Sequence, residues 1–348
     1  MFGRFQPSSG VTTPGWCWSA CRTRQSARIR IVGVLFLARF RVALHCLCHE
    51  VFAERSYKVE TGFTEGVVNV RIAYQGEPGA YSEAAALRFD SSAELLPRQA
   101  FEDVFHAVQE GTSTHGILPI ENTIAGSIHR NYDLMLEYQL PIVAEVKQPV
   151  VHNLIVSEGT TLQQVKRVYS HPKGLEQCER FLRTLSDVEI VATYDTAGSA
   201  KMIKEQGLTD TAAIASARAA EIFGLRVLKT GVQDYADNFT RFLIICRDPA
   251  PLGPPDKTTI VFTVPNDAGA LFKALSVFAL RDVDLTKLES RPIPDRPFEY
   301  LFYADLAANS EDVRCTRALA HLAEFAPSLS TLGSYPTWKE APAEIAEP

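Results

Sequence analysis

The 348-residue sequence lacks the motifs by which proteins commonly hold nucleotides and metal ions. No G-x-G-x-x-G follows a predicted strand and no G-K-S/T occurs, so a nucleotide cofactor has no support. The segment His45-Cys-Leu-Cys-His49 offers one ligand pair for zinc, but a structural zinc site needs a second pair and none follows. The other histidines lie without ligand spacing. We therefore predict an activity that uses no metal or other cofactor.

Long apolar runs are also missing. The stretch from Ile31 to Ala38 lies between two arginines and is too short to span a bilayer, so we predict no membrane partner. Residues 68–348 hold 26 Lys and Arg against 37 Asp and Glu, and this acidic balance argues against nucleic acid as a partner. A small-molecule partner is the remaining expectation.

Acidic residues are absent before Glu50, which makes the front of the chain basic. Residues 1–67 hold nine Lys and Arg against four Asp and Glu, and an arginine-rich, acid-poor start is typical of an organellar transit peptide. A secretory signal is the alternative, because the apolar stretch at 31–38 resembles the core of such a signal. Only three cysteines follow, however, and they lie too far apart to indicate a disulfide framework. We predict a transit peptide over residues 1–67 and an organelle with a reducing interior.

From residue 68 onward, short apolar runs alternate with segments of helical spacing. This alternation over residues 68–247 predicts an α/β domain with a mostly parallel sheet. The predicted strands are Val68–Tyr74, Gly116–Ile120, Val150–Val156, Val188–Ala192, Thr211–Ala215 and Phe242–Cys246. The main helices predicted between them are Glu83–Phe89, Gly174–Leu185, Ala197–Glu205 and Ala217–Phe223.

The remainder of the chain predicts a second domain. Residues 248–256 contain four prolines and indicate a stiff linker. Residues 257–337 follow the order strand, helix, strand, strand, helix, strand, which is that of the ferredoxin-like module. Such modules commonly pair edge to edge, so we expect a homo-oligomer, either a dimer or a tetramer. Residues 338–348 are a tail.

Small polar residues follow the predicted strands of the α/β domain. They lie in five loops: Gly79–Ser82, Glu121–Ser127, Ser170–Pro172, Asp195-Thr196 and Thr240-Arg241. Loops of this kind meet at the carboxyl edge of a parallel sheet. Ser82 and Ser127 also stand at predicted helix N-termini, whose N–H groups bind carboxylates. Any one of these residues could simply cap a helix, but five such loops together predict a site for a small polyanion.

These loops carry a resemblance to a known family. Gly76-x-x-Gly-Ala-Tyr-Ser82, Leu118-Pro-Ile-Glu-Asn-Thr123, Gly126-Ser-Ile128, Ser170-His-Pro172 and Asn238-Phe-Thr-Arg-Phe242 resemble the successive motifs of prephenate and arogenate dehydratases. Gly269-Ala-Leu-Phe272 and Glu289-Ser-Arg-Pro292 resemble the phenylalanine-sensing loops of their regulatory ACT domain. Thr123 and Phe272 depart mildly from the family pattern. The segments 127–133 and 210–221 are similar to the plastid-type enzymes, so a plastid is the expected location, with the cytoplasm as the alternative.

The resemblance implies a fold and a reaction. The fold is a two-lobed α/β catalytic domain, like a type II periplasmic binding protein, over residues 68–247, followed by a ferredoxin-like βαββαβ ACT domain. The reaction removes CO2 and hydroxide from a cyclohexadienol to leave an aromatic ring. Thr240 would donate a hydrogen bond to the leaving oxygen, Arg241 would hold a substrate carboxylate, and Phe242 would form an apolar wall.

The resemblance also implies two sets of binding residues. The predicted substrate-binding residues are Tyr81, Ser82, Asn122, Thr123, Gly126, Ser127, Thr196 and Phe242. The residues predicted to bind phenylalanine as a feedback effector are Gly269, Ala270, Leu271, Phe272, Glu289, Ser290, Arg291 and Pro292.

Two substrates fit this reaction. Arogenate carries a side-chain ammonium where prephenate carries a neutral ketone, so a site that prefers arogenate needs an acceptor near that nitrogen. Asp234 and Asp237 lie in the loop before Thr240 and are the predicted acceptors, although loop aspartates often only form turns. We predict an arogenate dehydratase with prephenate as a slower substrate. The alternatives are a strict prephenate dehydratase and, from another class, a non-enzymatic amino-acid sensor.

Overall fold

The computed structural model describes residues 70–248, 252–293, 296 and 298–340. The predicted transit peptide lies outside these residues. Among the described segments, no helix is long and apolar enough to cross a membrane. The same residues hold no group of three or more His, Cys, Asp or Glu side chains arranged to bind a metal ion.

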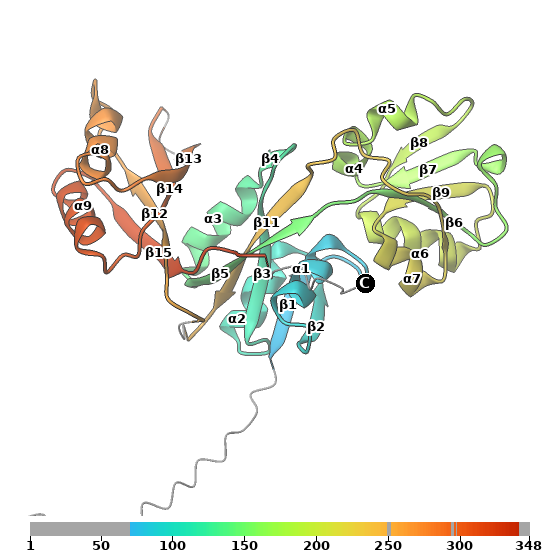
Figure 1. The fold of residues 1–348 in the computed structure, drawn as a ribbon, viewed down its shortest axis with the longest axis horizontal. Helices are drawn as coiled ribbons and strands as arrows, with labels where there is room; N and C mark the ends of the chain where they lie inside the picture. The colour runs from blue at the N-terminus through green and yellow to red at the C-terminus, as the bar shows by residue number, and fades with distance from the viewer. Residues whose placement is uncertain (1–69, 249–251, 294–295, 297, 341–348) are drawn as a thin grey trace, which may run out of the picture. The chain divides into compact units, whose positions relative to one another are not determined.

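The first lobe is built on a mixed sheet with the strand order β2-β1-β3-β11-β5, to which β4 adds by pairing with β3. Its strands are β1 (Arg71–Gln75), β2 (Glu94–Arg98), β3 (His115–Asn122), β4 (Gly126–Ser127), β5 (Ile142–Pro149) and β11 (Phe239–Cys246). Its helices are α1 (Tyr81–Phe89), α2 (Phe101–Gln109) and α3 (His129–Tyr138). Strand β11 lies between β3 and β5 and is antiparallel to both, although residues 150–238 separate it from β5 and residues 123–238 separate it from β3 (Figure 1).

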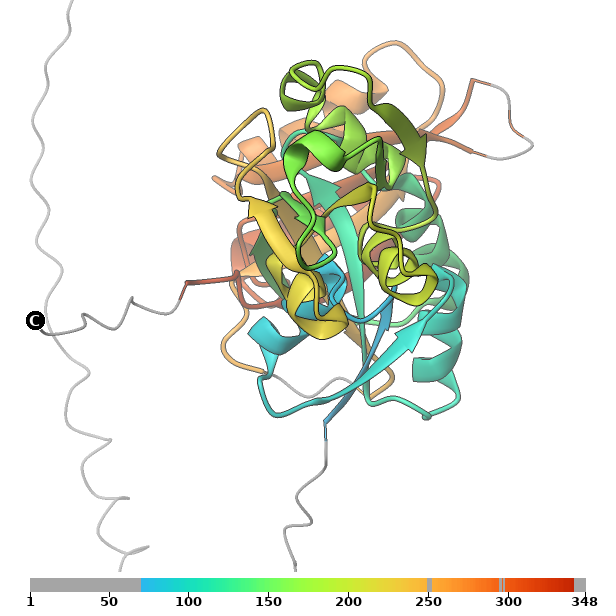
Figure 2. The same ribbon diagram turned by 90° about the vertical axis from the view of Figure 1, so that its right-hand side faces the viewer.

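The second lobe has its own mixed sheet, with the order β10-β6-β9-β7-β8. Its strands are β6 (Asn153–Val156), β7 (Arg167–Ser170), β8 (Glu189–Ala192), β9 (Thr211–Ala215) and β10 (Arg226–Lys229). Its helices are η1 (Leu162–Gln164), α4 (Pro172–Glu176), α5 (Glu179–Leu182), α6 (Thr196–Gln206) and α7 (Ala217–Phe223). Alternate residues of β9 face opposite ways, so Ala213 packs with α6 and α7 while Ile214 packs with the α4–α5 side. Figure 2 shows this lobe turned by 90° from Figure 1.

Two features of the lobes differ from the sequence prediction. The sheets are not mostly parallel, because β11 returns from the second lobe to pair with β3 and β5 and because β6 pairs antiparallel with both β9 and β10. The helix predicted over Gly174–Leu185 is two short helices, α4 and α5, separated near Cys178.

The C-terminal module confirms the predicted βαββαβ order. It contains β12 (Lys257–Thr263), α8 (Ala270–Ala279), β13 (Leu285–Pro292), β14 (Tyr300–Leu306), α9 (Val313–Ala323) and β15 (Leu329–Tyr335), with antiparallel strands in the order β13-β14-β12-β15. One face of this sheet packs on α8 and α9 through residues such as Phe262 and Phe302.

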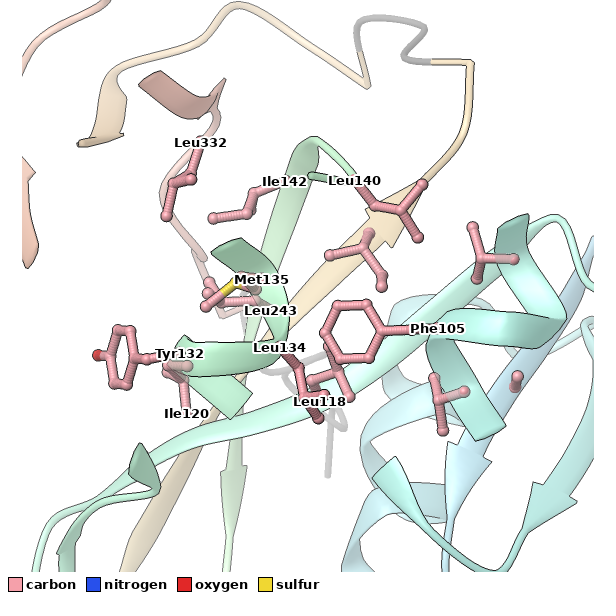
Figure 3. Close-up of a cluster of buried hydrophobic side chains, with 14 of the residues drawn as sticks. Phe105, Leu118, Ile120, Tyr132, Leu134, Met135, Leu140, Ile142, Leu243 and Leu332 are labelled. Atoms are coloured by element: carbon pink, nitrogen blue, oxygen red, sulfur yellow. The ribbon is translucent and has the colours of Figure 1, made fainter. Parts of the chain in front are cut away.

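The other face of the module's sheet packs on the first lobe. Leu332 of β15 and Tyr303 of β14 belong to one apolar cluster with Tyr132 and Met135 of α3, and Figure 3 shows Leu332 close to Ile142. Full burial of each large apolar side chain contributes about 1.5–3 kcal/mol to stability. Because these side chains form one buried cluster, the module and the first lobe share a continuous core. Gly333 permits the close approach, because a Cβ there would clash with the backbone carbonyl of Ile142.

Candidate active site

A cavity of about 500 Å³ is lined by residues of both lobes. This volume is typical of small-molecule sites. The first lobe contributes Gln75, Ala80, Tyr81, Ser82, Phe101, Pro119, Asn122, Ala125, Gly126, Ser127, Ile128, Val150, Thr240 and Phe242. The second lobe contributes His152, His171, Lys173, Gly174, Gln177, Tyr194, Asp195 and Thr196.

Thr240 and Phe242 reach this cavity from β11. They are two residues apart on an extended strand, so their side chains lie on the same face. The Thr240 hydroxyl oxygen accepts a hydrogen bond from the Asn122 side-chain amide at 3.0 Å. Within the described part of the chain, the hydroxyl proton of Thr240 has no acceptor of its own. It is therefore available to a ligand in the cavity.

The orientation of the Asn122 amide is set by the backbone. Its Oδ1 accepts from the N–H groups of Ile124 at 3.0 Å and Ala125 at 2.8 Å, so its Nδ2 must be the group that faces Thr240. Asn122 Nδ2 also donates to Asn238 Oδ1 at 2.8 Å. Because Nδ2 can only donate, Thr240 cannot use its proton on Asn122, and the geometry selects Thr240 as a hydrogen-bond donor towards the cavity.

The same network continues into the second lobe. Gln177 donates from Nε2 to Asn122 Oδ1 at 3.1 Å, and its Oε1 accepts from Asn238. Gln177 Oε1 lies 2.8 Å from His152 Nε2, which must therefore carry the imidazole proton. That leaves His152 Nδ1 without a proton, 3.1 Å from the Tyr81 hydroxyl, which also donates to the Val151 carbonyl at 2.8 Å. Burial lowers the pKa of His152, which favours this neutral form.

Arg241 is placed on the opposite face of β11, away from the cavity. Its guanidinium pairs with Glu145 of β5, with Asp305 of β14 and with the Tyr335 hydroxyl of β15. Glu145 also pairs with Lys257 of β12 at 2.9 Å. Strand alternation explains this placement, because successive side chains point to opposite faces of a sheet. The expectation that Arg241 holds a substrate carboxylate has no support in this geometry.

Most of the other predicted substrate-binding residues line the cavity, but not all of them do. Tyr81, Ser82, Asn122, Gly126, Ser127, Thr196 and Phe242 line the cavity with Thr240. Thr123 does not line it, since its hydroxyl bonds the backbone of Asp237 and Phe239 instead. Neither predicted ammonium acceptor lines it: Asp234 accepts from the Arg180 N–H, and Asp237 is exposed.

Several cavity residues of the second lobe were not among the predicted binding residues. His152 and Gln177 lie outside the recognised motifs, and the pattern of the sequence does not show that Gln177 meets Asn122 and His152. His171, Lys173 and Asp195 lie in strand-end loops or just after them, where ligand-binding side chains commonly occur. That position was the available signal for Asp195, which follows β8 and precedes α6.

The predicted effector residues lie on two elements of the C-terminal module. Gly269, with a φ of 80°, precedes α8, whose first residues are Ala270, Leu271 and the exposed Phe272. Glu289, Ser290, Arg291 and Pro292 form the end of β13. Glu289 accepts a hydrogen bond from the cavity-lining Ser127 at 2.7 Å, and Arg291 pairs with Asp133 of α3. A single hydrogen bond, between Ser127 and Glu289, thus connects the cavity to the segment predicted to sense phenylalanine.

Comparison with known proteins agrees with the motifs. Residues 72–250 match the family model described as prephenate dehydratase. The chain is 47% identical over 285 residues to arogenate dehydratase/prephenate dehydratase 6, chloroplastic, of Arabidopsis thaliana, covering 77% of this chain and 69% of that protein. It is 46% identical over 290 residues to arogenate dehydratase 2 of Petunia hybrida, covering 79% and 73% of the two chains.

Two solved structures are similar over most of the chain. Prephenate dehydratase in complex with L-Phe from Arthrobacter aurescens is 31% identical with a TM-score of 0.70, covering 77% of this chain and 90% of that one. GqqA, described as a novel type of quorum quenching acylase, is 37% identical with a TM-score of 0.71, covering 77% and 98%.

Proposed function

The chain belongs to the prephenate dehydratase family, and from that premise we propose that it converts arogenate to phenylalanine, and more slowly prephenate to phenylpyruvate. The observation that carries this proposal is the Thr240 hydroxyl, which is held by Asn122 so that its proton points to a cavity ligand. A group of this kind suits a reaction whose difficult event is the departure of an oxygen.

The reaction needs a donor and an apolar wall rather than a nucleophile. The bond between the ring and its carboxylate breaks to release CO2, the electron pair enters the ring, and the opposite carbon–oxygen bond breaks. Hydroxide leaves and takes a proton from solvent, so the products are an aromatic ring, CO2 and water. Thr240 stabilises the negative charge that develops on the leaving oxygen. Phe242 disfavours a charged carboxylate beside it and so favours its loss as neutral CO2.

The substrate carboxylates require partners other than Arg241. Helix α1 is preceded by Ala80, whose methyl group cannot cap the first turn, so the first N–H groups of the helix remain for an anion. Tyr81 and Ser82 of that turn line the cavity, and Lys173 and His171 face it from the second lobe. We assign carboxylate binding to this set.

The same family membership supports proposals about regulation and location. A relative was solved in complex with L-Phe, which supports phenylalanine as an effector of this chain. We propose that it binds through Gly269–Phe272 and Glu289–Pro292 of an ACT domain, and that the protein is a homo-oligomer. Arabidopsis relatives are named as chloroplastic, which supports a plastid location and a transit peptide before residue 68.

The rival activities make different demands on the cavity. A hydrolase such as an acylase commonly uses a nucleophile bonded to a histidine, and among the described cavity residues no serine or threonine hydroxyl bonds a histidine. A pure amino-acid sensor has no need of a donor aimed at a leaving group.

The test is turnover by the purified full-length protein. With prephenate, phenylpyruvate should accumulate and be detected by its ultraviolet absorbance. With arogenate, phenylalanine should accumulate and be measured by chromatography, at a higher kcat/KM. Binding of either compound without turnover would favour the sensor, and release of acid from an acyl amide with neither dehydration would favour the hydrolase.

A further inference from the structure

Asp195 is the one carboxylate among the described residues that line the cavity. It lies at the start of α6 in the second lobe, whereas the leaving-group donor Thr240 lies on β11 in the first lobe. The other ionisable side chains that line the cavity are Lys173, the two histidines and the two tyrosines. The cavity therefore offers several partners for substrate carboxylates and a single anion for a substrate cation.

The two oxygens of Asp195 have different surroundings. Oδ1 accepts a hydrogen bond from the Gly198 N–H at 2.8 Å and caps α6. No side chain among the described residues donates a hydrogen bond to Oδ2 or forms an ion pair with it. It lies opposite Gly76 of the first lobe, where a Cβ would come within 3.3 Å of it, and Gly76 has a φ of 118°, which disfavours any larger residue. A side chain at position 76 would therefore crowd Oδ2.

Among the described residues, no lysine or arginine forms an ion pair with Asp195. Burial raises its pKa, with the backbone N–H groups of Gly198 and Ala197 and the nearby His171 acting against this effect. Lys201 on the same helix pairs instead with Glu77 at 3.1 Å. When a ligand brings a cation next to a cavity carboxylate that has no cationic partner, the charged form of that carboxylate is stabilised.

The substrate can supply that cation. Its side chain and leaving hydroxyl are attached to opposite carbons of the ring, so a molecule whose hydroxyl meets Thr240 directs its side chain to the far end of the cavity. We propose that Asp195 binds the side-chain ammonium of arogenate and thereby sets the preference for arogenate over prephenate. This inference rests on the proposed function. The carboxylate accepts hydrogen bonds from an ammonium but repels the ketone oxygen of prephenate.

The structure also provides matched variants. Asp195→Asn and Asp195→Ser remove the charge, and both residues are good helix N-caps, so α6 should remain intact. Asp237→Asn is the control, because Asp237 is an exposed aspartate in the loop before β11 and does not line the cavity. All four full-length proteins, including the wild type, are assayed for kcat/KM with arogenate and with prephenate.

Wild type and Asp237→Asn should prefer arogenate. Both Asp195 variants should lose about ten- to a hundredfold in kcat/KM for arogenate, the range of one hydrogen bond to a charged group. The loss should appear mainly as a raised KM. Prephenate should be turned over as well as before or better, because Asn can donate to its ketone.

Three results would overturn the inference. An unchanged substrate ratio in the Asp195 variants removes Asp195 from recognition while leaving the proposed function intact. An equal loss with both substrates shows that Asp195 only caps α6. A wild-type protein that prefers prephenate removes the arogenate preference itself. Wild-type protein that turns over neither substrate is a separate outcome, since it refutes the proposed function together with this inference.

Discussion

Strand β11 presents Thr240 and Phe242 to the cavity and Arg241 to the C-terminal module, and the two faces use different chemistry. The cavity face places a neutral hydroxyl and an apolar ring where charge must move during a reaction. The module face holds four charges, those of Arg241, Glu145, Lys257 and Asp305, in a buried and balanced set. On the module face, charged side chains hold β11 against neighbouring strands. On the cavity face, β11 presents only neutral side chains, so the charges that meet them are those of the substrate.

Burial makes the charged face the more consequential one for stability. The side chain of Glu145 is fully buried and that of Asp305 is 4% exposed. Burial opposes ionisation of Glu145, but Arg241 and Lys257 outweigh it and hold the pKa of Glu145 below its ordinary value. Removal of one member of such a set leaves the others as uncompensated buried charges.

The largest expected effect is that of Arg241→Ala. It should cost about 3–5 kcal/mol of unfolding free energy, because Glu145 and Asp305 lose their shared partner. Urea unfolding followed by fluorescence measures this loss. Arg183→Ala is the matched control, since the Arg183–Glu179 pair is exposed and should contribute less than about 1 kcal/mol. Equal midpoints for Arg241→Ala and the wild type would contradict a structural role for Arg241.

The converse variant, Thr240→Ala, should leave unfolding nearly unchanged and reduce kcat by about 10²–10³-fold, the effect of one lost donor to a developing oxyanion. Thr240→Ser keeps the hydroxyl and should recover most of the rate. Steady-state kinetics on both variants, with urea midpoints measured alongside, provide the check. Turnover in Thr240→Ala at the wild-type rate would remove this hydroxyl from the mechanism.

The difference between the two faces of β11 could be predicted in part. The apolar run at 242–246 indicated the strand, and the motif indicated that Thr240 carries chemistry. Strand alternation alone then requires Arg241 to lie on the other face, so its absence from the cavity was available from the sequence. Because Thr240 and Arg241 belong to the same motif, both were predicted to contact the substrate, and the effect of strand alternation on Arg241 was overlooked.

Other parts of the site depend on tertiary contacts that no local pattern reveals. Strand β5 was missed because Glu145 and Lys147 interrupt its apolar pattern, and Glu145 is accommodated only by cations on β11 and β12. The antiparallel insertion of β11 depends on partners far away in sequence. Gln177 reaches Asn122, and His152 reaches Gln177, only because the chain crosses between the lobes beside Asn238.

Changes in pH should distinguish the buried ion pairs around Glu145 from the hydrogen-bond network of the cavity that contains His152. Glu145 has a lowered pKa in the fold, so its contribution is present above the ordinary carboxyl pKa of about 4.5 and is lost as pH falls through the lower folded value. His152 has a lowered pKa because of burial, so its contribution is present above about 6.5 and is lost as pH falls towards its folded value. Urea midpoints between pH 8 and pH 3 test both.

Single variants assign the two pH windows. Glu145→Gln should flatten the wild-type decline below pH 4.5. His152→Gln, which keeps a donor for Gln177, should flatten the part of the decline that begins as pH falls below about 6.5. Each effect should be smaller than the loss in Arg241→Ala, because only one protonation equilibrium changes. Variants whose profiles parallel the wild type throughout would show that the declines come from other groups.

The smallest expected effect concerns the place where the module meets the cavity. Glu289 on β13 bonds the cavity-lining Ser127, and Lys287 on the same strand donates to the same hydroxyl at 3.0 Å. Glu289→Gln keeps the shape of the side chain but removes its charge, so kcat should change less than about threefold, as expected for a partly exposed pair. Phenylalanine should lose much of its influence on turnover, because coupling energies are typically about 1–3 kcal/mol and this bond connects the effector segment to the cavity.

Arogenate kinetics with and without phenylalanine measure the coupling. Asp133→Asn, which removes the charge facing Arg291 on the same strand, is the control. If phenylalanine acts equally on Glu289→Gln and the wild type, its signal reaches the cavity by a contact other than the one between Glu289 and Ser127.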